Sequence, residues 1–451
     1  MARSGNAWLL SAWVGGMLAL VVLGGCATGL RSGDLKHYMD TGDCNVLAQA
    51  IERHPEGYGE RSELLFAMDA AMAFMRCDDL EAAQRWFREA DRLGEALWTE
   101  SVSRQAASFL TGDYVLSYPG EDYERVMVNL MSAIGFLKAG DLDGALVECR
   151  RLDSLLNVYN AKYASKSVYS EDAFARYLSG ILNEDDGSLD DAFIDYLRAA
   201  RVYDDYETHY GTRLPRILQE DLLRLAARVD REEDARALLP EELFEKREPD
   251  WDTRDMGRIV YLQLAGESPR KVEDAIFIPL KGGPVPLAFP RMVISPPACG
   301  GGQVALSAPG SEILTDAVLV EDINRIAVKN LADRQVRVIA KMLARAVAKQ
   351  AMIGGIANSA DDPNTQAAIR TALNIMNMFV ERADTRSWRT LPGEIYMTRV
   401  YAEPGTYQLR VITCGESRSL APVTVGAGQT RYVIDDARYA SGSGRGFVKR
   451  Q

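Results

Sequence analysis

The spacing of apolar residues divides the chain into a helical part and a part rich in strands. From about residue 41 to 243, apolar residues recur at i, i+3 and i+4, which predicts amphipathic helices throughout. After a charged run that includes Pro249, the apolar residues alternate with polar ones, which is typical of strands. We therefore expect an α+β multidomain protein, with a helical domain over residues 41–250 and a β-rich domain over 251–440.

The β-rich part is interrupted by a long helical segment. Strands are predicted at 259–262, 275–278, 304–306, 317–320, 395–401, 407–413 and 431–434. Two helices are predicted between the fourth and fifth of these strands, one from 322 to about 353 and one from Pro363 to about 381. This order predicts a β-sandwich-like domain with a helical hairpin inserted at about 321–382, followed by a flexible tail at 441–451.

The start of the chain has the pattern of a lipoprotein signal. An apolar run of about 16 residues follows Arg3 and is shorter than a membrane-spanning helix needs to be. The run ends in the lipobox residues Leu23, Gly24 and Gly25, followed by Cys26. Signal peptidase II recognises a branched apolar residue, two small residues and a cysteine in this order. We expect residues 1–25 to be a cleaved signal peptide, Cys26 to carry lipid and 26–40 to be a tether, with an uncleaved anchor as the alternative.

The residue after the lipidated cysteine indicates the membrane. Ala27 stands where an aspartate would retain a lipoprotein in the inner membrane, so the expected location is the outer membrane, lipid-anchored on its periplasmic face.

The remaining five cysteines would lie in the oxidising periplasm, where disulfides form. We predict pairing of Cys44 with Cys77, which are 33 residues apart in neighbouring helical units, and of Cys299 with Cys414 in the strand-rich half. Cys149 falls on an apolar helix face and is expected to be a buried thiol.

Several helical units repeat one arrangement of small and aromatic residues. In the clearest unit, Ala83, Phe87 and Ala90 follow an acidic turn, and Ala145 and Ala192 begin weaker copies. This spacing resembles the second helix of a tetratricopeptide repeat, although the intervals exceed the usual 34 residues. We expect the alanines and aromatics to pack neighbouring helices together.

A row of tyrosines at helical spacing has two interpretations, a binding groove or core packing, and packing is favoured. The row consists of Tyr196, Tyr203, Tyr206 and Tyr210.

Charge and composition exclude several classes of function. A formal net charge of −12 argues against nucleic-acid binding, which needs clustered cations. The three histidines, His37, His54 and His209, have no metal-ligand spacing to one another or to a cysteine. The sequence offers no Ser-His-acid order and no phosphate-binding loop, so we expect no metal, no cofactor and no enzymatic activity.

Two stretches are candidates for partner binding. In the long helix after residue 322, Arg337, Lys341, Arg345 and Lys349 recur every four residues and would form a basic ridge. The ridge could face anionic headgroups, a partner's acidic patch or the protein's own acidic helical domain.

The second stretch contains Asp384, Arg386 and Trp388. Its tryptophan either packs between the helical hairpin and the sheet or contacts a partner, since arginine and tryptophan are favoured at binding hot spots. Together with the turn at 404–405 and the Tyr-x-Gly-x-x-Tyr-Glu stretch at 118–124, it resembles a functionally uncharacterised family of bacterial outer-membrane lipoproteins with tetratricopeptide-like repeats.

These observations lead to a hypothesis about function. We expect a periplasm-facing lipoprotein that acts as a protein–protein interaction scaffold for envelope proteins and is held at the membrane by its N-terminal lipid. The resemblance implies a link to peptidoglycan assembly, with peptidoglycan as a candidate ligand. The alternatives are a glycan-binding or cell-wall-modifying protein and an accessory factor of an envelope export system.

Overall fold

A computed structural model describes residues 44–53, 58–59, 61–104, 116–162, 169–245, 253, 255–280, 283–295, 299–360, 362–380 and 382–437. The predicted signal peptide, the lipobox with Cys26, the tether and the tail lie outside the described residues. No helix in the described part is long and apolar enough to cross a membrane.

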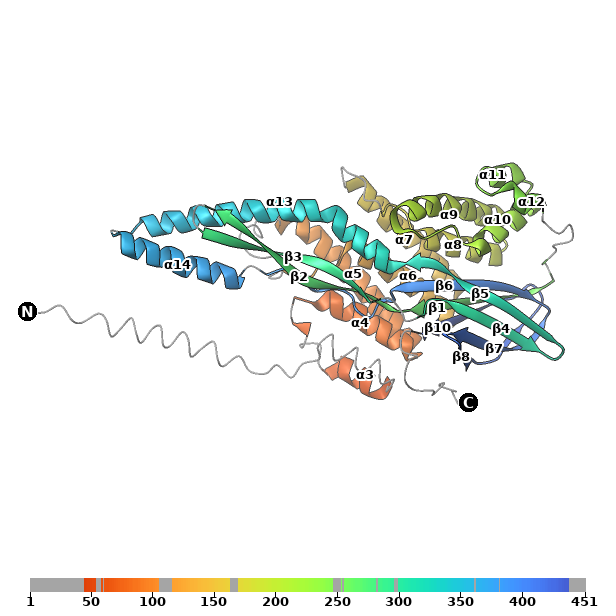
Figure 1. Cartoon of the computed structure of the whole chain (residues 1–451). Coiled ribbons are helices and arrows are strands. Elements are labelled where there is room, and N and C mark those ends of the chain that lie inside the picture. Colours follow the sequence, from red (N-terminus) through yellow and green to blue (C-terminus); the bar gives the residue numbers. More distant parts are fainter. Residues whose placement is uncertain are drawn as a thin grey trace, which may run out of the picture.

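The N-terminal part is a stack of helices (Figure 1). They are α3 (Cys44–Arg53), α4 (Glu63–Arg76), α5 (Leu80–Arg104), α6 (Asp122–Ala139), α7 (Leu142–Lys162), α8 (Ala173–Asp185), α9 (Leu189–Tyr210), α10 (Arg216–Arg228), α11 (Glu232–Arg236) and α12 (Glu241–Glu245). Tight turns join α4 to α5, α6 to α7 and α8 to α9. Each turn contains one residue with a positive φ, namely Asp78, Gly140 or Gly187. Such short connections make the joined helices antiparallel neighbours.

Small residues allow the paired helices to approach closely. Ala83, Ala145 and Ala192 are all completely buried, as predicted. A Cβ atom on Gly180 in α8 would lie 2.4 Å from the ring of Tyr196 in α9, so only glycine fits there. The tyrosine row of α9 is also buried, which confirms that it belongs to the core.

The C-terminal part contains a curled sheet and a separate hairpin. The strands are β1 (Gly257–Ala265), β2 (Glu267–Leu280), β3 (Gly283–Ser295), β4 (Gly302–Ala308), β5 (Ser311–Asp322), β6 (Glu394–Ala402), β7 (Gly405–Thr413), β8 (Glu416–Ser419), β9 (Val423–Val425) and β10 (Thr430–Asp436). The sheet has the order β10-β1-β6-β5-β4-β7-β8, with β9 also paired to β7, and β2 pairs with β3 alone. Within the sheet only β1 and β10 are parallel in the described residues.

Side chains bring the two ends of the curled sheet together. Arg418 of β8 donates to Asp435 of β10 at 2.5 Å, and Tyr261 of β1 donates to the same carboxylate at 2.6 Å. Ile259 of β1 and Val425 of β9 share an apolar cluster inside the curl. The predicted strands all lie within strands of the structure, while division into the two layers of a sandwich stays a prediction.

No strand was predicted for the segment that forms β3. Pro284, Pro286 and Pro290 lie within this strand. Proline cannot donate to a sheet ladder and is therefore tolerated mainly in edge strands. In the part of the chain that the structure describes, β3 pairs only with β2, so one edge of β3 does not need backbone N–H donors for a ladder.

The inserted helical hairpin lies between β5 and β6, as predicted. It consists of α13 (Ile323–Asn358) and α14 (Pro363–Val380). The carboxylate of Asp322 caps α13 by accepting from the backbone N–H of Arg325 at 2.9 Å. An acceptor at this position satisfies a helix donor that otherwise has no partner.

The helices and the sheet share one hydrophobic core. Val260, Leu262 and Leu264 of β1 belong to the same buried cluster as the helices, whereas Ile259 and Tyr261 point into the curl. This alternation follows from the two-residue period of a strand. Strand β1 therefore packs on the helices with one face and on the rest of the curled sheet with the other.

A buried group of charges crosses the contact between helices and sheet. Arg399 of β6 donates through Nη1 to Asp221 of α10 at 2.9 Å and to Glu184 of α8 at 3.0 Å. Arg224 of α10 donates to Glu184 at 2.6 Å. Burial raises the pKa of Glu184, but Arg399 and Arg224 outweigh it and hold the pKa below its usual range. The positive charges of these two arginines thus neutralise the negative charges of the two carboxylates.

Both predicted disulfides are present. Cys44 pairs with Cys77 at a Cα–Cα distance of 5.6 Å, and Cys299 pairs with Cys414 at 5.8 Å. Cys149 is a buried free thiol, as predicted, and burial raises its pKa.

We predict that Arg399→Ala lowers the free energy of unfolding by about 3–5 kcal/mol, because Glu184 and Asp221 lose a buried counterion. Denaturant titration followed by circular dichroism measures this loss. The matched control is Arg410→Ala, whose salt bridge to Glu312 is exposed and should contribute less than about 1 kcal/mol. Equal, small losses for both variants would contradict the assignment.

Candidate functional site

Two of the sequence stretches that carry the family resemblance, 118–124 and the one that contains Trp388, meet at the start of α6. Glu124 is completely buried, and its Oε1 accepts from the backbone N–H of Trp388 at 2.7 Å. Its Oε2 accepts from the Tyr118 hydroxyl at 2.5 Å and from the backbone N–H of Glu121 at 2.9 Å. Residues 264 positions apart in the sequence are thereby joined through one carboxylate.

Glu121 lies beside Glu124 and binds two cations from the C-terminal half. It forms salt bridges with Lys271 of β2 and with Arg334 of α13. It also caps α6, since Glu121 and Glu124 form a capping box. We call Glu121, Glu124, Lys271, Arg334 and Trp388 the α6 junction.

The electrostatics of the two carboxylates differ. Burial would raise the pKa of Glu121, but Arg334 and Lys271 lower it to about 2. Burial raises the pKa of Glu124, opposed by Lys271 and reinforced by the negative charge of Glu121. The junction therefore holds one strongly ionised carboxylate next to one whose ionisation burial disfavours.

Trp388 joins the junction to α4. Its side chain is completely buried, and its Nε1 donates to Thr390 at 2.9 Å. Thr390 donates in turn to Asp69 of α4 at 2.6 Å, and Asp69 also accepts from Tyr58 at 2.7 Å. Trp388 was a candidate partner contact, and that assignment is wrong for this structure because no part of the side chain reaches the surface. Trp388 instead packs inside the protein, which agrees with the packing role that the sequence analysis offered as its other interpretation.

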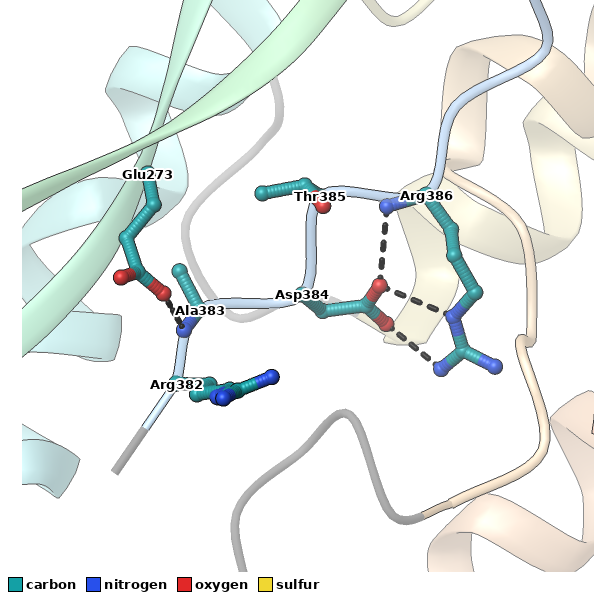
Figure 2. A pocket seen from close by; sticks show the side chains of 6 residues that line it. All are labelled: Glu273, Arg382, Ala383, Asp384, Thr385 and Arg386. Carbon is teal, nitrogen blue, oxygen red and sulfur yellow. Dashed lines mark hydrogen bonds and ion pairs between the residues drawn. The ribbon is translucent and has the colours of Figure 1, made fainter. Parts of the chain in front are cut away.

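Asp384 and Arg386 form a bidentate pair, with N–O distances of 2.9 and 2.7 Å (Figure 2). Arg386 also donates to the carbonyl oxygens of Arg61 and Leu116, at 2.8 and 2.9 Å. Its guanidinium lies 5.1 Å from the centre of the Tyr118 ring. These contacts occupy Arg386 and fix the segment against the helices.

An open polar pocket of about 520 Å³ lies beside this pair (Figure 2). Its lining residues are Glu273, Arg382, Ala383, Asp384, Thr385 and Arg386. Glu273 of β2 accepts from the backbone N–H of Ala383 at 2.7 Å. The lining offers charges of both signs and a hydroxyl, but no histidine or cysteine. Such a surface can hydrogen-bond a polar ligand, and nothing in it is arranged as a nucleophile with a base.

The predicted basic ridge is only partly at the surface. Arg345 is 3% exposed, which excludes it as a free contact, and Lys349 is partly exposed. Arg337 and Lys341 lie within α13, but their side chains are outside the described part. The hydrogen bonds of the Asp384–Arg386 pair described above do not involve the ridge. Arg334, which lies outside the predicted ridge, links α13 to the junction.

Only part of the junction has a recognisable pattern in the sequence. Glu121 and Glu124 have the three-residue spacing of a capping box before an apolar helix. Lys271 lies 150 residues from Glu121, and no local pattern distinguishes it from other lysines.

No group of three or more potential metal ligands occurs within the described residues. No protein-family model matches the chain, and no curated protein matches it. A solved structure described as "Crystal structure of BtubC (BKLC) from P. vanneervenii" is similar over 49% of this chain and 81% of that chain, with 12% identity and a TM-score of 0.30. Similarity at this level carries no argument about fold or function.

The depressed pKa of Glu121 predicts a loss of stability in acid. Because the folded pKa is about 2, below the usual 4.5, its contribution is fully present above about pH 4.5 and is lost as the pH falls towards 2. Glu121→Gln should therefore lower the free energy of unfolding by about 3–5 kcal/mol at pH 7. In this variant the free energy of unfolding should also fall less steeply between these pH values.

Thermal unfolding at a series of pH values measures both effects. Glu273→Gln is the control, because Glu273 lies on the same strand as Lys271 but is exposed. It should change stability by less than about 1 kcal/mol. A Glu121→Gln variant with the wild-type acid profile would refute the role given to this carboxylate.

Proposed function

We propose that this protein is a lipid-anchored, periplasm-facing outer-membrane protein that acts as a scaffold for other envelope proteins. The observation that carries the proposal is the lipobox ending in Cys26, followed by a chain with two disulfides. Disulfides suit an oxidising compartment, which agrees with the export that a lipobox implies. The acidic net charge also suits a protein that remains soluble beyond its anchor.

The scaffold role is supported by the paired helices. We infer that α4 to α9 are degenerate tetratricopeptide-like repeats, because each pair places a buried alanine where its helices meet. Stacked helix pairs form extended surfaces for binding proteins. Val147 and Val158 of α7 are both about half exposed and lie eleven residues apart, close to three helical turns, so they share one face. This face is our candidate contact for a protein partner.

We propose binding rather than turnover. The buried carboxylates of the α6 junction are engaged with backbone and side-chain donors and with two cations, which suits a structural role. The link to peptidoglycan assembly rests on the family resemblance.

A second candidate function is favoured by the polar pocket beside Asp384. Glu273, Arg382 and Thr385 offer acceptors and donors of the kind that recognise glycans, so a glycan-binding role is the alternative.

The Cys26→Ala variant tests the anchor. We predict that the protein leaves the outer-membrane fraction while both disulfides and the thermal stability are retained. Density-gradient fractionation, thiol labelling and thermal unfolding measure these outcomes. A variant that stays in the outer-membrane fraction even after a high-salt wash, which weakens charge-dependent contacts with lipid, would contradict the lipid anchor.

Photo-crosslinking in the same cells tests the scaffold with the full chain. A crosslinking residue in place of Val147 or Val158 should capture one defined envelope protein, whereas the same residue at Leu314 on β5, which is similarly exposed, should not. Capture from none of these positions, together with retention of the protein on peptidoglycan fragments, would favour the glycan-binding alternative instead.

A further inference from the structure

Part of the C-terminal half projects beyond the helical stack as an arm (Figure 1). The arm comprises β2, β3, residues 335–358 of α13, and α14. Inside the arm, Met342 and Ala346 of α13 form a buried cluster with Leu287 of β3. The base of the arm is held at the α6 junction, through Lys271 of β2 and Arg334 of α13.

The arm exposes an unusual share of large apolar side chains. Seven of the fourteen large apolar residues that are exposed in the described part belong to it. They are Ile276, Phe277 (63% exposed), Ile294, Leu343, Val347 (58%), Met352 (52%) and Ile356 (53%). An exposed apolar surface of this kind usually marks a site of interaction with protein or membrane.

The exposed residues of α13 lie on two sides of the helix. Leu343 and Val347 are one turn apart along the helix and share one side of it. Met352 and Ile356 are also one turn apart, but they lie on the opposite side. A flat, rigid protein face would cover only one of these pairs. Lipid headgroups can contact both pairs when the helix is partly sunk into the interface.

The arm also differs in charge from the rest of the chain. The strands and helical segments that make up the arm contain eight cations and three acids, a net charge of +5, which leaves −17 on the remainder. Arg370 of α14 is exposed and Lys349 is partly exposed, whereas Arg345 is buried and takes no part in the surface.

A second copy of the chain would match only one of these two properties. Residues 173–245 have a net charge of −9, complementary to the arm, but Ile194 is the one large apolar residue exposed among them. Another arm would supply apolar surface, but it would bring like charges together. An anionic lipid surface supplies both negative headgroups and an apolar layer beneath them.

We propose that the arm lies on an anionic lipid surface, with its exposed apolar residues at the level of the headgroups. This proposal rests on the proposed function, because the lipid on Cys26 would hold the chain close to a bilayer. The lipid would supply the anchor, and the arm would add a second contact with the membrane. It would then set how the helical stack is presented above the membrane.

The test uses vesicles and the chain from Ala27 onward, which carries no lipid. The protein should float with vesicles of phosphatidylglycerol and phosphatidylcholine, and bind at least about tenfold more weakly to vesicles of phosphatidylcholine alone or in high salt. Absence of binding to the anionic vesicles would overturn the proposal.

The matched variants separate the arm from the rest of the surface. The triple variant Phe277→Ser, Met352→Ser and Ile356→Ser should lose vesicle binding by at least about tenfold. Leu314→Ser, which removes an equally exposed residue (54%) from β5, should bind like the wild type. If the triple variant fails to fold, Val347→Ser alone repeats the test with a smaller change and should weaken vesicle binding.

Two further outcomes would overturn the proposal. One is a folded triple variant that binds vesicles as the wild type does. The other is a wild-type protein that sediments as a dimer which the triple variant does not form, because the occupant would then be a second copy. Since the tested chain has no lipid, these results do not depend on modification of Cys26. Fractionation of Cys26→Ala tests that modification separately.

Discussion

The structure depends on two carboxylates buried side by side at the start of α6. Two adjacent negative charges inside a protein are costly unless cations and hydrogen-bond donors surround them. Here the cations come from β2 and α13, and a backbone donor comes from Trp388. The positive end of the α6 dipole adds to these interactions. The two carboxylates therefore have all their partners only when α6, β2, α13 and the segment around Trp388 are in place together.

A second buried ionic group, around Arg399, joins the sheet to α8 and α10. Together with the α6 junction it holds the helical stack, the curled sheet and the base of the arm in defined orientations. Such a geometry suits a scaffold, because partner surfaces on the helices and a membrane-facing arm act together only if the angle between them is fixed. The proposed binding face on α7 and the arm are separate surfaces, so one can be occupied without displacing the other.

Local patterns in the sequence predicted much of the secondary structure, because apolar periodicity reports directly on helices and strands. Both disulfides could be predicted once the lipobox implied an oxidising compartment. The sequence could not predict which charges meet in the core: Lys271 and Arg399 look like ordinary surface cations until the fold buries them against distant carboxylates. The same limit applies to Arg345, which belongs to a regular basic ridge but is buried. It also applies to β3, because its prolines are more typical of turns than of strands.

The central claim is that one buried junction, at the start of α6, holds the helical stack, the arm and the segment around Trp388 together. Hydrogen exchange followed by mass spectrometry, comparing wild type with Glu121→Gln, tests it most directly. The account predicts faster exchange in β2, in the first half of α13 and around Trp388, as well as at the start of α6, with the β4–β7 strands unchanged. Faster exchange confined to the first turn of α6 would contradict it, because the carboxylate would then only cap its own helix.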